Sequence, residues 1–388
     1  MTTIGVFFGS RSPEHDVSII TAQLIISGLK SLSYKVIPIY ISKKGGWYIG
    51  GNLDSLKTFQ DPHFDIETTD FDRYYLDLEE SKGKMVFKSK TLLGKKVIID
   101  LAFPSFHGSF GEDGTVQGLF EMFSIPYVGC DVSSSAIAMD KIVNKLLYQA
   151  LGFPTTKFMH FDKNFWEKDR KAIITSIKKS LKLPFFVKPP NLGSSIGITK
   201  IQHIQDLEDA IDVAVQYGDS VLVEEGVENL VDLTCCVIGN DDPIPSLLQE
   251  SVFSSDLFNF DEKYLKKGGA HLGKAQDSII IPARLDDKTT QAIQIMSVAI
   301  YKTLGLSGIG RIDFLYNQKT KKIYANEINP LPGTLYYHLW NKSGIQLPAL
   351  LEKLIGFAKE RHDKHQKIAY SFSSSILSQS GSPKLPNP

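Results

Sequence analysis

The chain lacks the features that mark several large classes of protein. No apolar run approaches the length of a membrane span, so we expect no transmembrane helix and no membrane partner. Lysine plus arginine and aspartate plus glutamate both number 43, so no excess of positive charge indicates a nucleic-acid partner. The first residues, MTTIGVFFGS, lack the charged region and apolar core of a secretory signal and enter a strand-like run directly. No internal repeat is visible.

Cysteine is also scarce. Cys130, Cys235 and Cys236 show no metal-ligand spacing, and their odd number leaves a free thiol in any disulfide scheme. These features favour a reduced, cytoplasmic protein. The hydrophobic content of 42% and the charged content of 22% are typical of a soluble globular chain, and 388 residues predict about two or three compact units.

Strands and helices alternate in the first part of the chain. TIGVFFG and YKVIPIYI read as strands on either side of a helix over residues 17–31, and KKVIIDLAFPSFHG reads as a further strand before the helical TVQGLFEMF. This order predicts an α/β domain with an open parallel sheet, which binds ligands at the carboxyl ends of its strands.

The later part of the chain has a different pattern. Helices are predicted over residues 141–152 and 163–181, and the strands SVLVEE, GIGRIDFLY and KIYANEIN are longer and alternate. The pattern predicts a mixed or antiparallel sheet, and hence an α+β arrangement. Residues 371–388 are rich in serine and proline and are expected to be disordered.

The stretch GRIDFLYNQKTKKIYANEIN predicts a hairpin with polar residues on one face. A turn near Thr320 sets Asp313 opposite Glu327 and Arg311 opposite Asn329. Two carboxylates placed so close together repel unless a cation separates them, so we predict Mg²⁺ that bridges phosphates. The alternative is a solvated hairpin face, and the apolar residues of the opposite face weaken it.

Two glycine-rich stretches resemble phosphate loops. In FVKPPNLGSSIG, Lys188 ends an apolar strand, and residues 193–197 offer backbone N–H groups and hydroxyls that suit phosphate oxygens. An exposed Gly/Ser turn explains that stretch equally well. GGAHLGKA, residues 268–275, ends in Ala275 where a phosphate loop has a hydroxyl, and no helix follows it, so we interpret it as a flexible loop.

Two loops follow predicted strands of the first domain. Glu14, in GSRSPEHDVS, is suited to hold a ligand amine, and His107, in FHGSFGEDGTVQG, is suited to face a carboxylate. Helix capping by Asp16 or Asp113 and a hydrogen-bonded strand-end histidine are the structural alternatives. Taken one at a time, these loops favour the structural alternatives.

In their order, the motifs resemble the D-alanine–D-alanine ligase family of the ATP-grasp superfamily over about residues 3–360. The matching stretches are EHDVS, HGSFGEDGTVQG, YVGC, AMDKIVNK, VKPPNLGSSIG, EEGVEN, DEKY, GRIDF and NEIN followed by PG. The resemblance implies an ATP-grasp fold preceded by the N-terminal α/β domain. The implied bounds are 1–136 for the substrate domain, 137–220 for the small central subdomain and 221–370 for the C-terminal subdomain, with a mobile loop at 254–274.

The resemblance also implies a role for individual residues. The implied ATP-binding residues are Lys141, Lys188, Ser195, Glu224, Glu225, Val227 and Asp232. The implied catalytic residues are Glu14, Ser194, Lys263, Tyr264 and Arg311, and the magnesium ligands are Asp313, Glu327 and Asn329. The implied substrate contacts are His107, Gly333 and His338.

The implied reaction is the ATP-dependent joining of two D-alanines in the cytoplasm for peptidoglycan precursors. ATP phosphorylates the carboxylate of the first D-alanine, and the amine of the second attacks the acyl phosphate. The resemblance implies a homodimer that uses ATP and Mg²⁺. It implies two magnesium ions, which Mn²⁺ is able to replace.

Three positions depart from the family pattern. Asp232 follows leucine and valine where the family has Gly-Arg-Glu, Pro330 replaces a threonine, and His338 stands where we expect the family's serine. These departures leave the acceptor open, so another amino acid or a hydroxy acid is the alternative acceptor. A nucleotide-binding protein without ligase activity is the alternative from another class.

Overall fold

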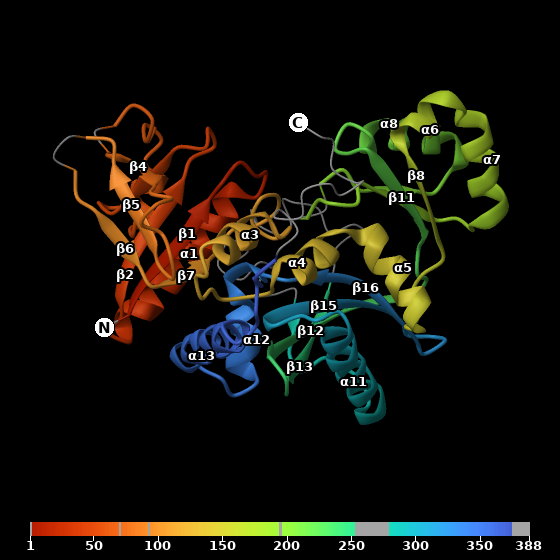
Figure 1. Cartoon of the computed structure of the whole chain (residues 1–388). Coiled ribbons are helices and arrows are strands. Elements are labelled where there is room, and N and C mark those ends of the chain that lie inside the picture. Colours follow the sequence, from red (N-terminus) through yellow and green to blue (C-terminus); the bar gives the residue numbers. More distant parts are fainter. Residues whose placement is uncertain (1, 70, 92–93, 194–195, 253–278, 375–388) are drawn as a thin grey trace.

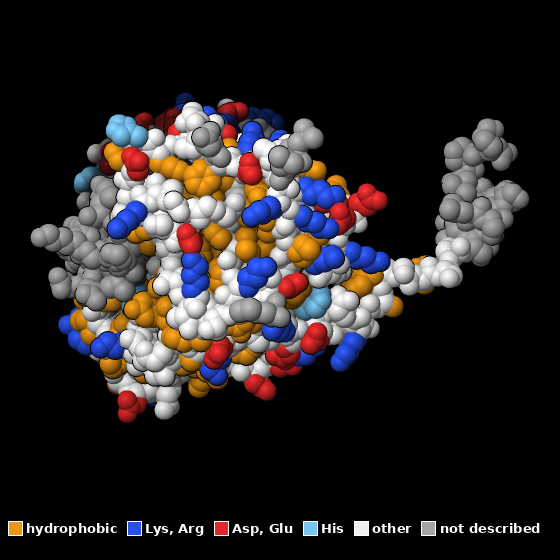
Figure 2. Space-filling view, turned by 90° about the vertical axis from the view of Figure 1, so that its left-hand side faces the viewer, with side chains coloured by type: hydrophobic (Ala, Val, Ile, Leu, Met, Phe, Trp, Pro, Cys, Tyr) orange, Lys and Arg blue, Asp and Glu red, His pale blue; other side chains and the backbone are white. Residues whose placement is uncertain are grey.

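The computed structural model describes residues 2–69, 71–91, 94–193, 196–252 and 279–374 of the 388. Within these ranges, three β-sheets follow one another along the chain, each covered by helices (Figure 1). No helix of the described ranges combines the length and the apolar character that crossing a membrane requires. Basic and acidic side chains are interspersed on the face shown in Figure 2.

The first sheet has the strand order β6-β5-β4-β3-β2-β1-β7. Its strands are β1 (Thr3–Gly9), β2 (Lys35–Ile41), β3 (Trp47–Ile49), β4 (Arg73–Leu76), β5 (Met85–Ser89), β6 (Val97–Ile99) and β7 (Leu101–Pro104). β1 pairs in parallel with β2 and with β7. The pairing with β2 is parallel because helix α1 (His15–Ser31) carries the chain back between the two strands. The predicted parallel sheet is therefore present at β1, β2 and β7, and the strands from β3 to β6 extend it in antiparallel fashion.

One predicted strand of this domain is two strands. KKVIIDLAFPSFHG breaks at Asp100 into β6 and β7. The carboxylate of Asp100 accepts a hydrogen bond from the backbone N–H of Thr3, 2.8 Å away, which holds the break against the start of β1. The short helix α2 (Leu56–Gln60) also belongs to this part of the chain.

The second sheet has the order β10-β9-β11-β8. Its strands are β8 (Phe158–Asp162), β9 (Phe185–Lys188), β10 (Thr199–Ile201) and β11 (Ser220–Glu225). Helices α6 (Lys163–Lys168), α7 (Arg170–Ser180), η1 (Ile204–Asp206) and α8 (Leu207–Ala214) pack on this sheet. Of the preceding helices, α3 (Thr115–Met122) packs in the core of the first sheet, whereas α4 (Val132–Met139) and α5 (Lys141–Leu151) contact a strand of the third. The single helix predicted over 163–181 is α6 and α7, because Asp169 caps the backbone N–H of Ala172 at 3.0 Å and starts a new helix.

The third sheet is antiparallel, which is one of the two arrangements that the sequence predicts, and its strand order is β14-β13-β12-β15-β16. Its strands are β12 (Leu230–Gly239), β13 (Ile244–Ser251), β14 (Ile279–Ile280), β15 (Gly308–Asn317) and β16 (Lys322–Asn329). Helices α11 (Asp287–Thr303), η3 (Gly333–Tyr336), α12 (Tyr337–Lys342) and α13 (Leu347–His365) accompany it. One face packs on α11 in a core that includes Leu233, Ile312 and Phe314, so the residues between them point to the opposite face.

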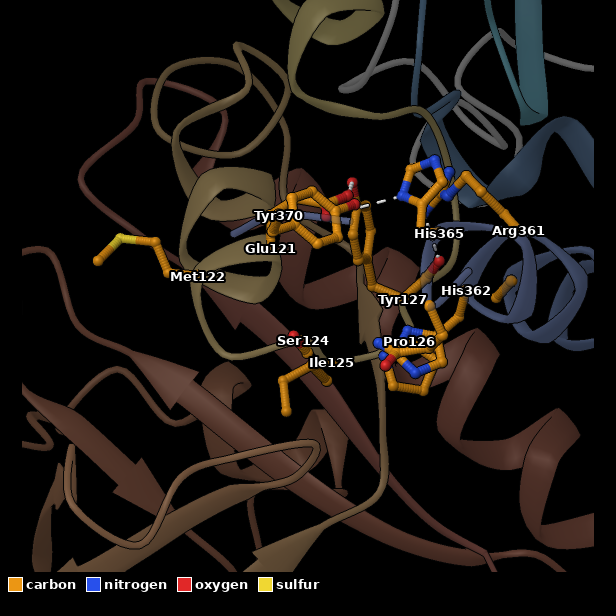
Figure 3. Close-up of a pocket in the computed structure, with 12 residues that line it drawn as sticks. Glu121, Met122, Ser124, Ile125, Pro126, Tyr127, Arg361, His362, His365 and Tyr370 are labelled. Atoms are coloured by element: carbon orange, nitrogen blue, oxygen red, sulfur yellow. Dashed lines mark hydrogen bonds and ion pairs between the residues drawn. The ribbon is translucent and has the colours of Figure 1, made fainter. Parts of the chain in front are cut away.

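Arg361 of α13 joins distant parts of the chain. Its guanidinium lies 4.2 Å from the ring centre of Tyr127 and donates to the carbonyl of Tyr127 at 2.8 Å. It also donates to the carbonyl of Gly129 and to the hydroxyl of Ser307 at 2.6 Å. Figure 3 shows the adjacent pocket of about 360 Å³, where Glu121 lies between the hydroxyl of Tyr127 and His365 of α13.

Candidate active site

The polar residues of the predicted hairpin lie on the face of the third sheet that is opposite α11. β15 and β16 pair as the sequence predicts, with Asp313 opposite Glu327 and Arg311 opposite Asn329. Asp313 is buried, and its carboxylate accepts from the hydroxyl of Thr234 at 2.8 Å. Two nitrogens of Arg311 donate to the same carboxylate at 3.0 and 2.7 Å, so the geometry brings the predicted patch together.

Two cations neutralise the carboxylates of this patch. Lys141 of α5 lies 3.4 Å from Glu327, and its ammonium also donates to the carbonyl of Leu192 at 2.7 Å. Arg311 lies 4.0 Å from Glu327 and 4.9 Å from the ring centre of Tyr336. Burial opposes the charge of Arg311, but the neighbouring Asp313 outweighs it, so the pKa of the guanidinium stays well above its ordinary value.

The donor set of this patch fits a hard cation held partly by phosphate. The side-chain amide nitrogen of Asn329 donates to Asp313 at 3.4 Å, and Glu327 lies opposite Asp313, so two carboxylates and one amide group lie together. Among the described residues, no three His, Cys, Asp or Glu side chains converge on a point that suits a metal ion. Magnesium in phosphate-transfer sites is typically held by one or two carboxylates plus phosphate oxygens and water, and this set provides that much.

A buried ionic cluster lies beside the patch. Lys145 and Lys188 both pair with the carboxylate of Glu224, and the Lys145 distance is 2.5 Å. Lys145 also donates to the hydroxyl of Thr156 at 2.8 Å, and that hydroxyl donates to Glu224 at 2.6 Å. The sequence predicts Lys188 and Glu224 as ATP-binding residues, and the structure brings them together. The prediction missed Lys145, although its place one helical turn after Lys141 was a signal.

Burial and charge work against each other in this cluster. Burial favours the neutral form of Glu224, but Lys145 and Lys188 outweigh it, so the pKa of Glu224 lies below its ordinary value. Burial lowers the pKa of Lys145, and Glu224 opposes that change. The cluster thus holds one carboxylate between two ammonium groups, away from water.

The remaining predicted ATP-binding residues have mixed placements. Val227 lines a cavity of about 1030 Å³, together with Phe186 and Tyr316. Glu225 accepts from the backbone N–H of Lys182 at 2.9 Å. Asp232 lies on β12, on the same face as Thr234 and Asp313. Four further predicted site residues lie outside the described residues: Ser194, Ser195, Lys263 and Tyr264. The same holds for loop 254–274.

Glu14 lies between two glycines in the N-terminal part of the site. A Cβ atom added to Gly193 would lie 2.8 Å from a carboxylate oxygen of Glu14, and one added to Gly108 would lie 3.0 Å from it. The predicted loops therefore meet around this carboxylate. Prediction missed Glu112, which is buried and accepts from the N–H of Gly108 at 2.6 Å. Burial and the charge of Glu14 raise the pKa of Glu112 to about 8.

His107 and Gly333 lie next to each other, although 226 residues separate them. A Cβ added to Gly333 would lie 3.9 Å from the His107 ring. Nε2 of His107 lies 2.8 Å from the hydroxyl of Thr21, which also accepts from the N–H of Thr334 at 3.1 Å. Burial and the charge of Arg311 lower the pKa of His107 to about 3, so the ring is neutral at neutral pH. Thr334 is a buried hydroxyl beside Gly333 that the sequence prediction missed.

The turn after Gly333 is left-handed. Thr334, Leu335 and Tyr336 have φ angles of 50°, 55° and 49°, a conformation that residues with a Cβ rarely adopt in succession. It leads to His338, whose Nε2 lies 2.7 Å from Oε1 of Gln249 on β13. The role of His338 at the acceptor remains a prediction.

Two family models match this chain in sequence. Residues 3–130 match the family described as D-ala D-ala ligase N-terminus, and residues 147–356 match D-ala D-ala ligase C-terminus. The chain belongs to the D-alanine–D-alanine ligase family. The resemblance, the ATP-grasp fold and the assignment as a ligase are therefore confirmed.

Individual relatives of the family match over nearly their whole length. The D-alanine–D-alanine ligase of Thermosipho melanesiensis is 39% identical over 97% of this chain and 98% of its own. That of Geobacillus thermodenitrificans is 36% identical over 96% and 99%. The structure of the ligase from Coxiella burnetii has a TM-score of 0.76 at 27% identity and covers 95% and 98% of the two chains. VanG D-Ala:D-Ser ligase from Enterococcus faecalis has a TM-score of 0.76 at 32% identity and covers 92% and 99%.

Proposed function

We propose that this chain is an ATP-dependent ligase that joins two D-alanines through an acyl phosphate to supply peptidoglycan precursors. The observation that carries the proposal is the convergence of three parts of the chain on one site. Asp313, Glu327 and Arg311 come from the third sheet, Lys141 from α5, and Glu14 from the loop after β1. We further propose that the protein acts in the cytoplasm as a homodimer, and that the three-part division at residues 136 and 220 holds.

The cations of the site suit the phosphates of ATP. Lys141 pairs with Glu327 and with the carbonyl of Leu192, and Lys188 pairs with Glu224, so both ammonium groups are suited to bind phosphate oxygens. Bound at Asp313, Glu327 and Asn329, Mg²⁺ would neutralise charge on the transferring phosphoryl group. We propose two such ions, which Mn²⁺ is able to replace.

Arg311 is suited to stabilise the oxyanion that forms when the amine attacks. Asp313 holds two of its nitrogens and the Tyr336 ring supports its face, so little reorganisation is needed when charge develops. Glu14 is suited to bind the amine of the first D-alanine, because its carboxylate is buried between two backbone segments.

Two amino acids are candidates for the acceptor substrate. The hydroxyl of Thr334 donates to the carbonyl of Gly333 at 2.7 Å, and Gly333 lies beside the His107 ring, so a small carboxylate can be recognised here. D-alanine is the proposed acceptor. D-serine is the alternative, because one solved relative at 32% identity is titled a D-Ala:D-Ser ligase.

Release of ADP tests the function directly. The protein is given ATP, Mg²⁺ and D-alanine, alone or with D-serine or D-lactate as a competing acceptor, and the products are weighed by mass spectrometry. We expect ADP release that depends on D-alanine, with D-Ala–D-Ala as the main product. The variant Asp313→Asn is the control that should be inactive. Release of ADP without any amino acid would overturn the proposal, and a dominant mixed product would move it to the alternative acceptor.

A further inference from the structure

The loop that carries Glu14 starts with two residues in the left-handed region. Gly9 and Ser10 have φ angles of 91° and 82°. A Cβ added to Gly9 would lie 2.2 Å from the carbonyl oxygen of Ile41, so glycine is required there. Ser10 has a Cβ, and its conformation is strained by about 1 kcal/mol or more. The surroundings must therefore hold the Ser10 backbone in place.

The ring of His15 provides that support from inside the protein. It is 2% exposed, its Nδ1 lies 2.6 Å from the carbonyl oxygen of Ser10, and its Nε2 lies 2.9 Å from the hydroxyl of Tyr40. A carbonyl oxygen only accepts, so Nδ1 carries the proton and Nε2 accepts from Tyr40. Burial lowers the pKa of His15 against the opposing effect of the Ser10 carbonyl, and the charged groups that face the ring are Lys43 and Asp16.

Hydrogen bonds fix the backbone at several points between Ser10 and Glu14. The N–H of Ser10 donates to the carbonyl of Ile41 at 2.7 Å, so both ends of this peptide unit are fixed. Two residues later, the hydroxyl of Ser12 donates to the carbonyl of His107 at 2.6 Å and accepts from the N–H of Glu14 at 3.1 Å. The backbone of Arg11 joins Ser10 to Ser12, so a shift of the Ser10 carbonyl would be passed along this short segment to Ser12 and Glu14.

The space around Glu14 leaves little room for such a shift. Gly108 and Gly193 approach its carboxylate so closely that an added Cβ would lie 3.0 and 2.8 Å away. We propose that His15 is a positioning residue that sets the place of the Glu14 carboxylate through the Ser10 carbonyl. The proposal rests on the proposed function, in which Glu14 binds the amine of the first D-alanine. His15 does not touch the substrate in this account.

Two substitutions separate the two bonds of the His15 ring. The amide nitrogen of asparagine takes roughly the place of Nδ1, so His15→Asn keeps a donor for Ser10 and loses the Tyr40 bond. The amide of glutamine reaches roughly to Nε2, so His15→Gln keeps a partner for Tyr40 and loses the Ser10 bond. Tyr40→Phe removes the Tyr40 bond without touching the ring, and His15→Ala removes both bonds.

The measurement follows the hydroxamate product, which forms from D-alanine bound at the first site. D-alanine is varied at saturating ATP, and saturating hydroxylamine replaces the second D-alanine as the nucleophile that takes the acyl group and releases phosphate. We expect the KM for D-alanine to rise about tenfold or more in His15→Gln and His15→Ala, because small displacements of binding groups have effects of this size. It should stay within about threefold of wild type in His15→Asn and Tyr40→Phe. A purely structural role would lower Tm in all four variants without this split.

The outcomes distinguish the inference from the function on which it rests. If Glu14→Gln leaves the KM for D-alanine unchanged, the proposed role of Glu14 is wrong. If Glu14→Gln raises that KM while His15→Gln and His15→Asn have equal values, only the role of His15 is overturned. Should His15→Ala fail to fold, the Asn and Gln variants decide: a KM that follows the Ser10 bond supports the inference, and one that follows the Tyr40 bond refutes it.

Discussion

The buried cluster of Lys145, Lys188 and Glu224 leads to a prediction about stability. Lys145→Met removes the 2.5 Å ion pair with Glu224 and the hydrogen bonds to two threonine hydroxyls. Breaking a buried pair typically costs about 3–5 kcal/mol because a charge is left without its partner. Glu224 keeps Lys188 and a hydroxyl donor in this variant, so we expect a loss near the lower limit, about 3 kcal/mol.

The second variant of the pair should be the more damaging. Glu224→Gln leaves two ammonium groups facing a neutral amide in a region where Lys145 and Glu224 are each 1% exposed, so we expect a loss of about 4–5 kcal/mol. The double variant buries an amide beside an apolar chain and leaves only Lys188 charged. Its loss should fall about 2–3 kcal/mol short of the combined single losses, within the range found for residues in contact.

Urea unfolding of the nucleotide-free protein, followed by circular dichroism, measures all three losses. Lys171→Met, on the exposed surface of α7, is the matched control and should change the free energy of unfolding by less than about 0.5 kcal/mol. Single losses that add to within about 0.5 kcal/mol would refute the reasoning, because they would show that the two side chains do not interact.

Three further predictions concern catalysis and pH. Asp313→Asn should abolish turnover at ordinary Mg²⁺ while its circular dichroism stays that of wild type; near-normal rates would remove Asp313 from the site. The stability that His107 contributes is full above about pH 6.5 and is lost as the pH falls toward about 3, whereas that of Glu112 is full below about pH 4.5 and is lost as the pH rises through about 8. The two effects oppose each other between about pH 4.5 and 6.5, so the Tm of the ligand-free protein should be nearly constant there. In Glu112→Gln only the effect of His107 remains, so the range of constant Tm should move above about pH 6.5. A range that does not move would contradict the raised pKa of Glu112. Thr334→Val should raise the acceptor KM more than His338→Ser does, as measured from initial rates against acceptor concentration. The reverse order would show that His338 is the residue that binds the acceptor.

The hairpin of β15 and β16 was predictable because its information is local. A two-residue period and a turn near Thr320 predict that Asp313 lies opposite Glu327, and the pair is present, although the strand register shifts between Asp313 and Phe314. The same logic gave the parallel core of the first sheet from its strand–helix order. The break at Asp100 was not predictable, because the partner that holds it is the N–H of Thr3, 97 residues away.

Two site residues were missed for the same reason as the break at Asp100, because their structural role depends on distant parts of the chain. Lys145 reads as an ordinary helix lysine until Glu224, 79 positions later, is placed against it. Thr334 reads as part of a loop, because a left-handed run of residues with side chains has no local sequence signal. Such contacts depend on how distant segments pack, and one sequence holds no direct record of that packing.

The left-handed turn from Thr334 to Tyr336 bears on how acceptor choice can change over evolution. Each such residue is disfavoured by about 1–2 kcal/mol, so the three together store about 3–6 kcal/mol that the rest of the fold must supply. One end of the turn is held by Thr21, and the Tyr336 ring at the other end lies against Arg311. A replacement within the turn would act on both contacts, because they lie at its two ends. We therefore expect the three residues of the turn to change together in evolution, so that a new acceptor preference arises when the whole segment is replaced.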